Sequence, residues 1–231
     1  MSWYKIGKYK NFVKGVNKVI NKMKVIKFYK VNEPFGCFSN FSPHPIFINN
    51  ERWNTVEHYF QASKFCNIEV KEKIQQLESP MKAAIEGRNK KNKLREDWEV
   101  VKEDVMYKAL KFKFMQHPML LHKLLMTDDQ IIIEHTENDN YWADGGDGNG
   151  QNRLGVLLMK LREEFLVEID DKNIVLPPWI AFPTISPNDL FWRMGLGEDY
   201  LSSWVRYYES IDRVNYREKY PVIKEWEEFY D

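Results

Sequence analysis

The sequence predicts an α+β fold that is predominantly helical, with a small β component. The chain has 231 residues, of which 43% are hydrophobic, so it can bury a sizeable core. Segments with helical spacing outnumber the short strand-like segments. The two kinds do not alternate in the strand–helix–strand order of a doubly wound sheet, which favours α+β over α/β.

The expected strands are short, and most of them precede the helices. Val25–Tyr29 is predicted to be a strand, and the prolines within Asn32–Pro45 exclude a helix there. Ile46–Ile48 and Glu51–Trp53 flank the pair Asn49-Asn50, which is typical of a small hairpin.

Capping residues mark where the first helices begin. Thr55 is expected to cap a helix that continues to about Phe65, with Glu57 in its first turn. Ser79-Pro80 is expected to start a second helix, because proline is tolerated in the first position, and Gly87 to end it.

The later elements of the core follow from spacing. Asp97 is expected to cap a long helix whose apolar residues recur at helical intervals: Trp98, Val101, Val105, Ala109 and Phe112. His117-Pro118 should open a helix to about Met126, and Ile131–Ile133 should be a short buried strand. A further helix is predicted over Val156–Leu166.

Charge and composition divide the chain into three predicted parts: a basic leader helix over residues 1–24, a main domain over 25–166 and a helical extension over 167–231. Residues 1–30 carry nine lysines and no acid, although the whole chain has no net charge. We interpret the leader as an amphipathic helix with a solvated lysine face, or as an arm that binds nucleic acid or a membrane surface.

The predicted extension has a different composition. Residues 167–231 carry thirteen acidic residues against seven basic ones, together with thirteen aromatic residues. Helices are expected over Glu198–Ile211 and Asn215–Tyr230. So many aromatic rings indicate packing against the core or an oligomer contact, and the oligomeric state stays open.

Several classes of protein are disfavoured. No apolar run is long enough to span a membrane, and the first 30 residues lack the apolar stretch of a secretory signal. Cys37 and Cys66 are too few for a disulfide framework, so a reduced, intracellular, cytoplasmic protein is expected. The five histidines show no metal-type grouping, and the usual dinucleotide, P-loop and serine-hydrolase motifs are absent, so no metal or cofactor is expected.

The segment Glu134–Gly155 is the strongest sign of a site. It combines acids and Trp142 with a dense group of glycines, which lets a ligand approach the main chain closely. A glycine-rich loop that leads into a helix is expected to present free N–H groups to a phosphate or carboxylate. A calcium loop built on Asp144 and Asp147 is disfavoured, because the acids do not occupy alternate positions before one glycine.

Other candidate residues could belong to a site or could have an ordinary structural role. Glu57, Gln61 and Lys64 fall on one face of the helix that follows Thr55, which could equally be an exposed face without a function. Trp98 could be a core residue or could stack on a planar heterocycle. Trp142 is the better stacking candidate, because it lies in the glycine loop itself.

Two arginines outside this helix are further candidates. Arg88 and Arg95 flank the loop Asn89–Leu94 and could reach a phosphate, or they could belong to a solvated basic loop.

Taken together, these segments resemble the YbiA-like, or NADAR, family from about Val25 to Leu166. The segments that carry the resemblance are Phe38-Ser39-Asn40-Phe41, Thr55-Val56-Glu57-His58-Tyr59-Phe60-Gln61-Ala62, Lys64-Phe65, Ser79-Pro80-Met81, Trp98, Val101-Lys102, Val105-Met106 and Glu134–Gly155. In one place the chain departs from the pattern: Gly150-Gln151-Asn152 lacks the lysine that the family leads us to expect near the second position.

The resemblance implies an N-glycosidase that cleaves the C–N bond between ribose and a nitrogenous partner. Its substrates would be reactive ribosylaminopyrimidine phosphates of riboflavin synthesis, or ADP-ribose attached to guanine in nucleic acid. A non-catalytic module that binds NAD-like or ADP-ribosyl ligands is the alternative from another class. The family's functional positions map to Glu57, Trp98, Trp142 and Asp144.

The chemistry of the bond suggests a role for each residue. An oxocarbenium-like state needs a carboxylate that stabilises charge and activates water. We assign this role to Glu57, and to Asp144 that of a second carboxylate or of a contact to a ribose hydroxyl. The two tryptophans would clamp the heterocycle. The remaining substrate-binding predictions, several of them for the phosphate, are Gln61, Lys64, Arg88, Arg95, Asn152 and the loop glycines Gly145 and Gly146.

Overall fold

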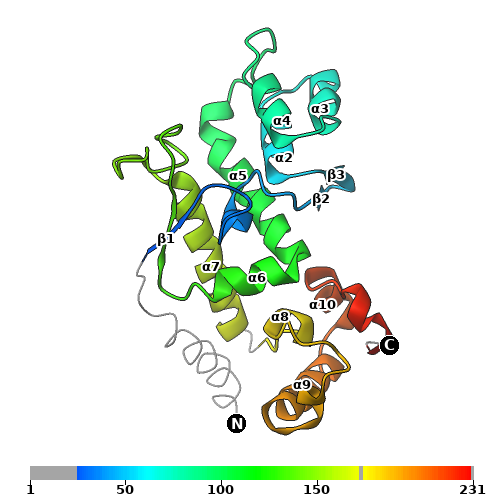
Figure 1. Cartoon of the computed structure of the whole chain (residues 1–231). Coiled ribbons are helices and arrows are strands. Elements are labelled where there is room, and N and C mark those ends of the chain that lie inside the picture. Colours follow the sequence, from blue (N-terminus) through cyan, green and yellow to red (C-terminus); the bar gives the residue numbers. More distant parts are fainter. Residues whose placement is uncertain (1–24, 172–173, 230–231) are drawn as a thin grey trace. The chain divides into compact units, whose positions relative to one another are not determined.

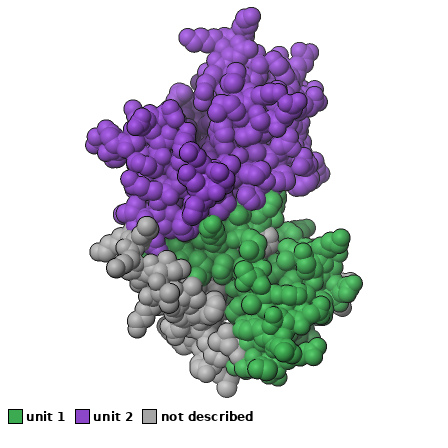
Figure 2. All heavy atoms as spheres, in the orientation of Figure 1, with its two compact units in different colours: residues 1–23, 115–129, 162–231 green, residues 24–114, 130–161 purple. Residues whose placement is uncertain are grey.

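The computed structural model describes residues 25–171 and 174–229, and the predicted leader helix over residues 1–24 lies outside them. Helices dominate and strands are few, which confirms the predicted α+β class (Figure 1). By its internal contacts the chain forms two compact units, coloured separately in Figure 2. Unit 2 comprises residues 24–114 and 130–161, and unit 1 comprises residues 1–23, 115–129 and 162–231. The three predicted parts of the chain, and the two boundaries between them, stay predictions.

The strands of unit 2 form two small sheets. β1 (Val25–Phe28) pairs in parallel with β4 (Ile131–Glu134), so that Phe28 faces Glu134 at the end of the ladder. β2 (Ile46–Ile48) and β3 (Glu51–Trp53) form the predicted antiparallel hairpin.

The turn of this hairpin explains its sequence. Asn49 and Asn50 have φ angles of 54° and 65°, which are the left-handed values that a two-residue hairpin turn requires and that asparagine tolerates.

The helices of unit 2 begin where capping chemistry predicts. The Thr55 hydroxyl accepts a hydrogen bond from the His58 N–H at the start of α2 (Val56–Ala62). Ser79 caps α4 (Pro80–Glu86) in the same way, and Gly87 ends it. In Figure 1 these two helices lie together with α3 (Ile68–Gln75).

α3 is absent from our sequence predictions. Asn67 caps it, but Ile74 is its only buried residue, so little of this helix belongs to the core.

Two long helices contain residues that are assigned to both units. α5 (Trp98–Gln116) begins directly after Asp97, as predicted, and α7 (Arg153–Asp171) begins three residues before its predicted start. The core of unit 2 is aromatic as well as aliphatic: the ring of Phe38 lies 5.9 Å from that of Phe28 and 6.0 Å from that of Phe114. A 3-10 turn, η1 (Gly36–Phe38), places Phe38 there.

Unit 1 is helical. Its elements in chain order are α6 (Pro118–Leu125), α8 (Pro178–Ala181), η2 (Leu190–Arg193), α9 (Gly195–Glu209), α10 (Arg213–Lys219) and η3 (Lys224–Phe229). The aromatic residues of the extension pack on one another. The ring of the buried Trp179 lies 5.8 Å from that of Trp204 and 6.0 Å from that of Trp226.

One predicted helix of the extension is wrong in its length. We expect it over Asn215–Tyr230, but α10 ends at Lys219 and η3 is a separate 3-10 segment. Pro221 accounts for the break, because proline disfavours helical backbone in the residue before it, here Tyr220.

Candidate active site

Glu57 is a buried carboxylate that two amide side chains hold. It lies in the first turn of α2 and is 3% exposed. Gln61 Nε2 donates to Glu57 Oε1 at 2.6 Å, and Asn40 Nδ2 donates to Glu57 Oε2. The Glu57 N–H also donates to the Asn40 carbonyl at 3.0 Å, so both the backbone and the side chain of Glu57 are fixed.

Burial raises the pKa of Glu57 to about 7, although the bonds from Gln61 and Asn40 and the cations of Lys64 and Arg88 act in the opposite direction. A carboxylate with this pKa can accept a proton near neutral pH far better than an ordinary glutamate. The geometry therefore suits a general base.

Asp144 is also buried, at 3% exposure, but its environment has the opposite effect. Burial alone would raise its pKa. The His135 ring, with Nδ1 2.7 Å from Asp144 Oδ2, and the Gly146 N–H, 2.9 Å from Oδ1, outweigh burial and lower it. Asp144 is therefore suited to stay deprotonated, as an acceptor or a stabiliser of positive charge.

The glycine-rich loop folds around Asp144. The Asp144 carbonyl accepts hydrogen bonds from the amides of Gly148 at 3.1 Å and Gly150 at 2.8 Å. Gly145 and Gly146 have φ angles of +73° and +77°, which favour glycine at both positions.

These bonds change the expected role of the loop amides. The Gly145 amide donates to the Asp139 carbonyl at 3.2 Å, and the Gly146 amide donates to the Asp144 side chain. Both donors are used inside the loop and are not free, contrary to what the glycine pattern suggests. Contacts of Gly145 and Gly146 with a phosphate remain a prediction.

Asn152 connects the loop to the strand β4. Its Oδ1 accepts from the Glu134 N–H at 3.0 Å, and its Nδ2 donates to the Ile132 carbonyl at 2.9 Å. The side chain thus bonds to the strand as a neighbouring backbone would. With a φ of 48°, Asn152 also adopts the left-handed conformation that asparagine tolerates, just before α7.

The predicted aromatic residues meet at Phe60. The Phe60 ring lies 5.1 Å from that of Trp98 and 5.4 Å from that of Trp142. Trp98 is 6% exposed, whereas Trp142 is half-buried. Trp142 thus has the more accessible ring for stacking on a planar ligand.

Two of the three predicted cations lie near Glu57. Lys64 and Arg88 both act electrostatically on its carboxylate, and Lys64 Nζ lies 5.8 Å from the centre of the Trp98 ring. Burial lowers the pKa of Lys64.

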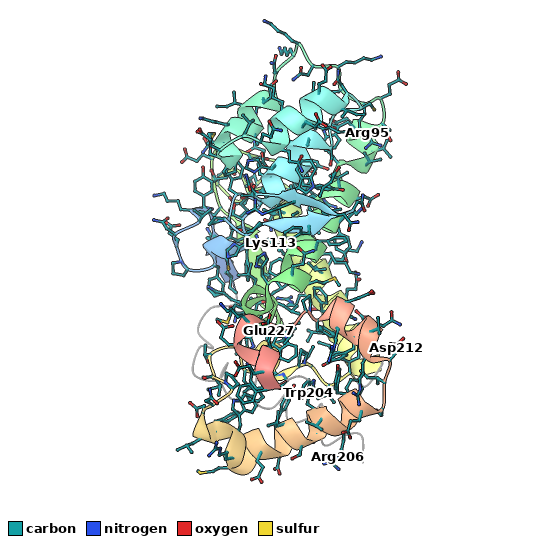
Figure 3. All side chains as sticks on the ribbon, turned by 90° about the vertical axis from the view of Figure 1, so that its right-hand side faces the viewer. Arg95, Lys113, Trp204, Arg206, Asp212 and Glu227 are labelled. Atoms are coloured by element: carbon teal, nitrogen blue, oxygen red, sulfur yellow. The ribbon has the colours of Figure 1, made fainter. Side chains whose placement is uncertain are left out.

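The third cation is engaged elsewhere. Arg95, labelled in Figure 3, forms two hydrogen bonds with the exposed Asp97, at 2.6 and 2.8 Å. Its guanidinium therefore holds the start of α5, and its contact with a phosphate stays a prediction.

Sequence reasoning missed several residues that complete the site. Asn40 belongs to a family motif, but no spacing rule shows that it holds Glu57. Glu103 receives a bidentate bond from Arg153 at 2.8 and 2.6 Å and a third bond from the Tyr141 hydroxyl at 2.6 Å. Glu103 thereby fastens both ends of the glycine loop to α5. Figure 2 shows the surface of unit 2 hollowed between this loop and the helices beside it.

The part of the chain that the structure describes contains no group of three or more acidic, histidine or cysteine side chains that could hold a metal ion. In that part, too, no helix combines the length and the apolar character needed to cross a membrane.

Comparison with known proteins gives consistent results. The family model described as the NADAR domain matches residues 27–166. The N-glycosidase YbiA of Escherichia coli (strain K12) is 51% identical over 144 residues, which are 62% of this chain and 90% of that protein. The riboflavin biosynthesis protein PYRR, chloroplastic, of Zea mays is 42% identical over 157 residues, 62% of this chain and 25% of that protein. The NMR structure of E. coli YbiA superimposes with a TM-score of 0.59 at 51% identity and covers 62% of this chain and 86% of that one.

Proposed function

The chain belongs to the NADAR family, and from this membership we propose that it is an N-glycosidase whose substrate is a ribose 5-phosphate joined to a nitrogenous heterocycle. The name of the E. coli relative supports the reaction class. The name of the maize relative assigns that protein to riboflavin biosynthesis, and the family resemblance implies a ribosylaminopyrimidine phosphate of that synthesis as the substrate.

The observation that carries this proposal is the environment of Glu57. Its carboxylate is buried, held on both oxygens by Asn40 and Gln61, and has a pKa of about 7. Hydrolysis of an N-glycosidic bond needs a base that can take a proton from water near neutral pH. An oxocarbenium-like transition state also needs a nearby negative charge. Glu57 supplies both.

The other residues take roles that fit their contacts. Asp144, with its lowered pKa, accepts a hydrogen bond from a ribose hydroxyl or stabilises the positive charge at the anomeric carbon. Lys64 and Arg88 hold the phosphate, because they are the cations that act on the Glu57 site. Trp142 stacks on the heterocycle from the loop side, and Trp98 supports the opposite wall through Phe60.

The proposal is tested by mass spectrometry of the products released from a ribosylaminopyrimidine 5-phosphate. We expect the wild type to release ribose 5-phosphate and Glu57→Gln to lose about 10²–10⁴-fold in kcat/KM, because general base catalysis typically contributes that much. Glu69→Gln is the matched control: Glu69 is likewise the second residue of its helix, α3, but it is exposed.

Two results would contradict the proposal. Equal activity of Glu57→Gln and the wild type would remove Glu57 from the mechanism. No release by the wild type would leave the ADP-ribosyl-guanine reaction on nucleic acid, for which the nine lysines of residues 1–30 are the supporting observation. Affinity that falls steeply with salt would then identify contacts with nucleic acid phosphates.

A further inference from the structure

The proposed reaction needs a proton donor that the roles above do not provide. When the C–N bond breaks, the electron pair moves to the nitrogen, and an amine leaves readily only if it is protonated. Glu57 must be deprotonated to activate water. Asp144 has a lowered pKa and both oxygens engaged, so it is a poor donor.

Glu134 is bonded to Asp144 through its backbone, and its carboxyl group interacts electrostatically with both of these acids. It is the last residue of β4 and is 8% exposed. Its N–H donates to Asn152 Oδ1 at 3.0 Å, and its carbonyl accepts from the Asp144 N–H at 2.9 Å. A side chain on such a fixed backbone is held where a reacting group must be held.

The carboxyl group of Glu134 has an unusual environment. The groups that act on it electrostatically are all acids: Asp139, Glu57 and Asp144. Within residues 25–171 and 174–229, no hydrogen-bond donor and no cation bonds to this carboxyl group. A buried carboxyl group among carboxylates keeps its proton, because neither burial nor its neighbours favour the charged form.

We propose that Glu134 is the general acid that protonates the departing nitrogen in the N-glycosidase reaction. The inference rests on the proposed function and adds a residue to it. The proton of Glu134 moves to the nitrogen as the C–N bond breaks, and the oxygen of water bonds to the anomeric carbon. One proton of that water moves to Glu57, and the other stays on the new hydroxyl group of the ribose. The products are ribose 5-phosphate and the free amine, and solvent returns the two carboxyl groups to their starting states.

The pKa values support this division of labour. Burial first, and then the neighbouring acids, raise the pKa of Glu134 to about 8, against about 7 for Glu57. The cations and amide donors around Glu57 favour its charged form, whereas only acids act on Glu134, so Glu57 gives up its proton more readily and Glu134 keeps its own, which is the combination that the reaction needs.

His135 is the rival donor. Its side chain is 39% exposed, and Nδ1 is bonded to Asp144. An imidazole oriented by a carboxylate is a common proton carrier. The experiment must therefore separate Glu134 from its neighbour in the sequence.

The test compares two leaving groups. One substrate is a ribosylaminopyrimidine 5-phosphate, whose amine needs a proton, and the other is 4-nitrophenyl riboside 5-phosphate, whose phenolate leaves without one. We expect Glu134→Gln to lose about 10²–10³-fold in kcat/KM on the first substrate and less than about 5-fold on the second. His135→Gln should change the two substrates equally.

A second measurement keeps the inference falsifiable. For the wild type, kcat/KM on the amine substrate should fall as pH rises through about 8, and Glu134→Gln should lose this alkaline limb. If Glu134→Gln does not fold, Glu134→Asp retains an acid at the site and should show the same dependence on leaving group with a smaller loss.

The failures of the two proposals are distinct. A wild type that releases ribose 5-phosphate together with a Glu134→Gln variant that loses equally on both substrates, or on neither, would overturn the role of Glu134 alone. A leaving-group-dependent loss in His135→Gln would transfer the role to His135. A wild type that is inactive on both substrates would overturn the proposed function itself.

Discussion

The two units of this protein bury polar groups in opposite ways. In unit 2, Glu57 and Glu134 are buried carboxyl groups whose pKa values rise to about 7 and about 8. In unit 1, the buried Arg162 donates from an Nη atom to the Thr127 hydroxyl at 2.9 Å, and both side chains have partners. Most of the other buried side chains of unit 1 are aliphatic or aromatic.

The difference identifies where the chain carries out chemistry. Burial of a carboxylate that forms no direct ion pair costs free energy, because the charged form loses its hydration. A fold that needs only stability avoids this, as the ring clusters of unit 1 do. Unit 2 retains the cost at Glu57 and Glu134, which is expected of groups that exchange protons during a reaction.

The largest expected effect comes from removing one of the two side-chain hydrogen bonds that hold Glu57. Asn40→Leu removes a donor that lowers the pKa of Glu57. The acid limb of the rate profile, where activity rises as Glu57 loses its proton, should therefore move to higher pH. We expect kcat/KM at pH 7 to fall about 100-fold, chiefly because Glu57 also loses the bond that positions its Oε2, and a misplacement of about 1 Å can cost 10²-fold. Measurement of kcat/KM from pH 5 to 9 tests this.

Asn92→Leu is the matched control, because Asn92 bonds to Glu86, which does not act on Glu57. Its profile should match that of the wild type. An acid limb that does not move in Asn40→Leu would contradict the assignment of that limb to Glu57.

The next expected effect is on the free energy of unfolding, and it is a gain for the variant, whereas the first effect is a loss of activity. In the unfolded chain Glu134 has an ordinary pKa of 4.5, whereas burial and neighbouring acids raise it to about 8 in the fold. The folded protein thus binds more protons, and its stability falls as pH rises from 4.5 through about 8. Glu134→Gln cannot ionise, so it should gain on the order of 3 kcal/mol relative to the wild type between pH 5 and pH 9.

Urea unfolding at the two pH values measures this difference. Glu69→Gln, an exposed acid in α3, should show none of it. A Glu134→Gln variant whose advantage is the same at pH 5 and pH 9 would show that Glu134 does not hold a proton in the fold.

The sequence predicts much of this fold, because many element boundaries depend on local chemistry. Thr55 and Ser79 cap helices through their own hydroxyls, and the pair Asn49-Asn50 supplies the left-handed turn of the hairpin. No local rule predicts the parallel pairing of β1 with β4, which joins segments more than 100 residues apart.

The site shows the same division. Glu57, Trp142 and Asp144 follow from motif and spacing, and the structure gives each a specific environment. Glu134 and Asn40 could not be singled out, because their importance depends on side chains that approach from distant segments: Asn40 reaches Glu57 across 17 residues, and Asn152 reaches Glu134 across 18. The sequence also could not show that the amides of Gly145 and Gly146 are already bonded, because this depends on how the loop brings them to Asp139 and Asp144.

The smallest expected effect lies in unit 1 and affects stability alone. The Tyr216 hydroxyl accepts from Trp204 Nε1 at 3.0 Å and donates to the Val175 carbonyl at 2.6 Å. Tyr216→Phe removes both bonds, one buried and one part-buried, and should lower the free energy of unfolding by about 1–2 kcal/mol. Tyr207→Phe is the matched control, because its ring lies only 5.9 Å from that of Tyr216 but its hydroxyl forms no hydrogen bond within the described chain.

Urea unfolding and kcat/KM should be measured on both tyrosine variants. We expect kcat/KM to stay within about twofold of the wild type, because Tyr216 belongs to unit 1 and Glu57, Glu134 and Asp144 all belong to unit 2. A loss of activity in Tyr216→Phe that exceeds its loss of folded protein would mean that the aromatic cluster of unit 1 supports the reaction as well as the fold. The contrast between a unit that buries carboxyl groups for chemistry and a unit that buries rings for stability would then have to be abandoned.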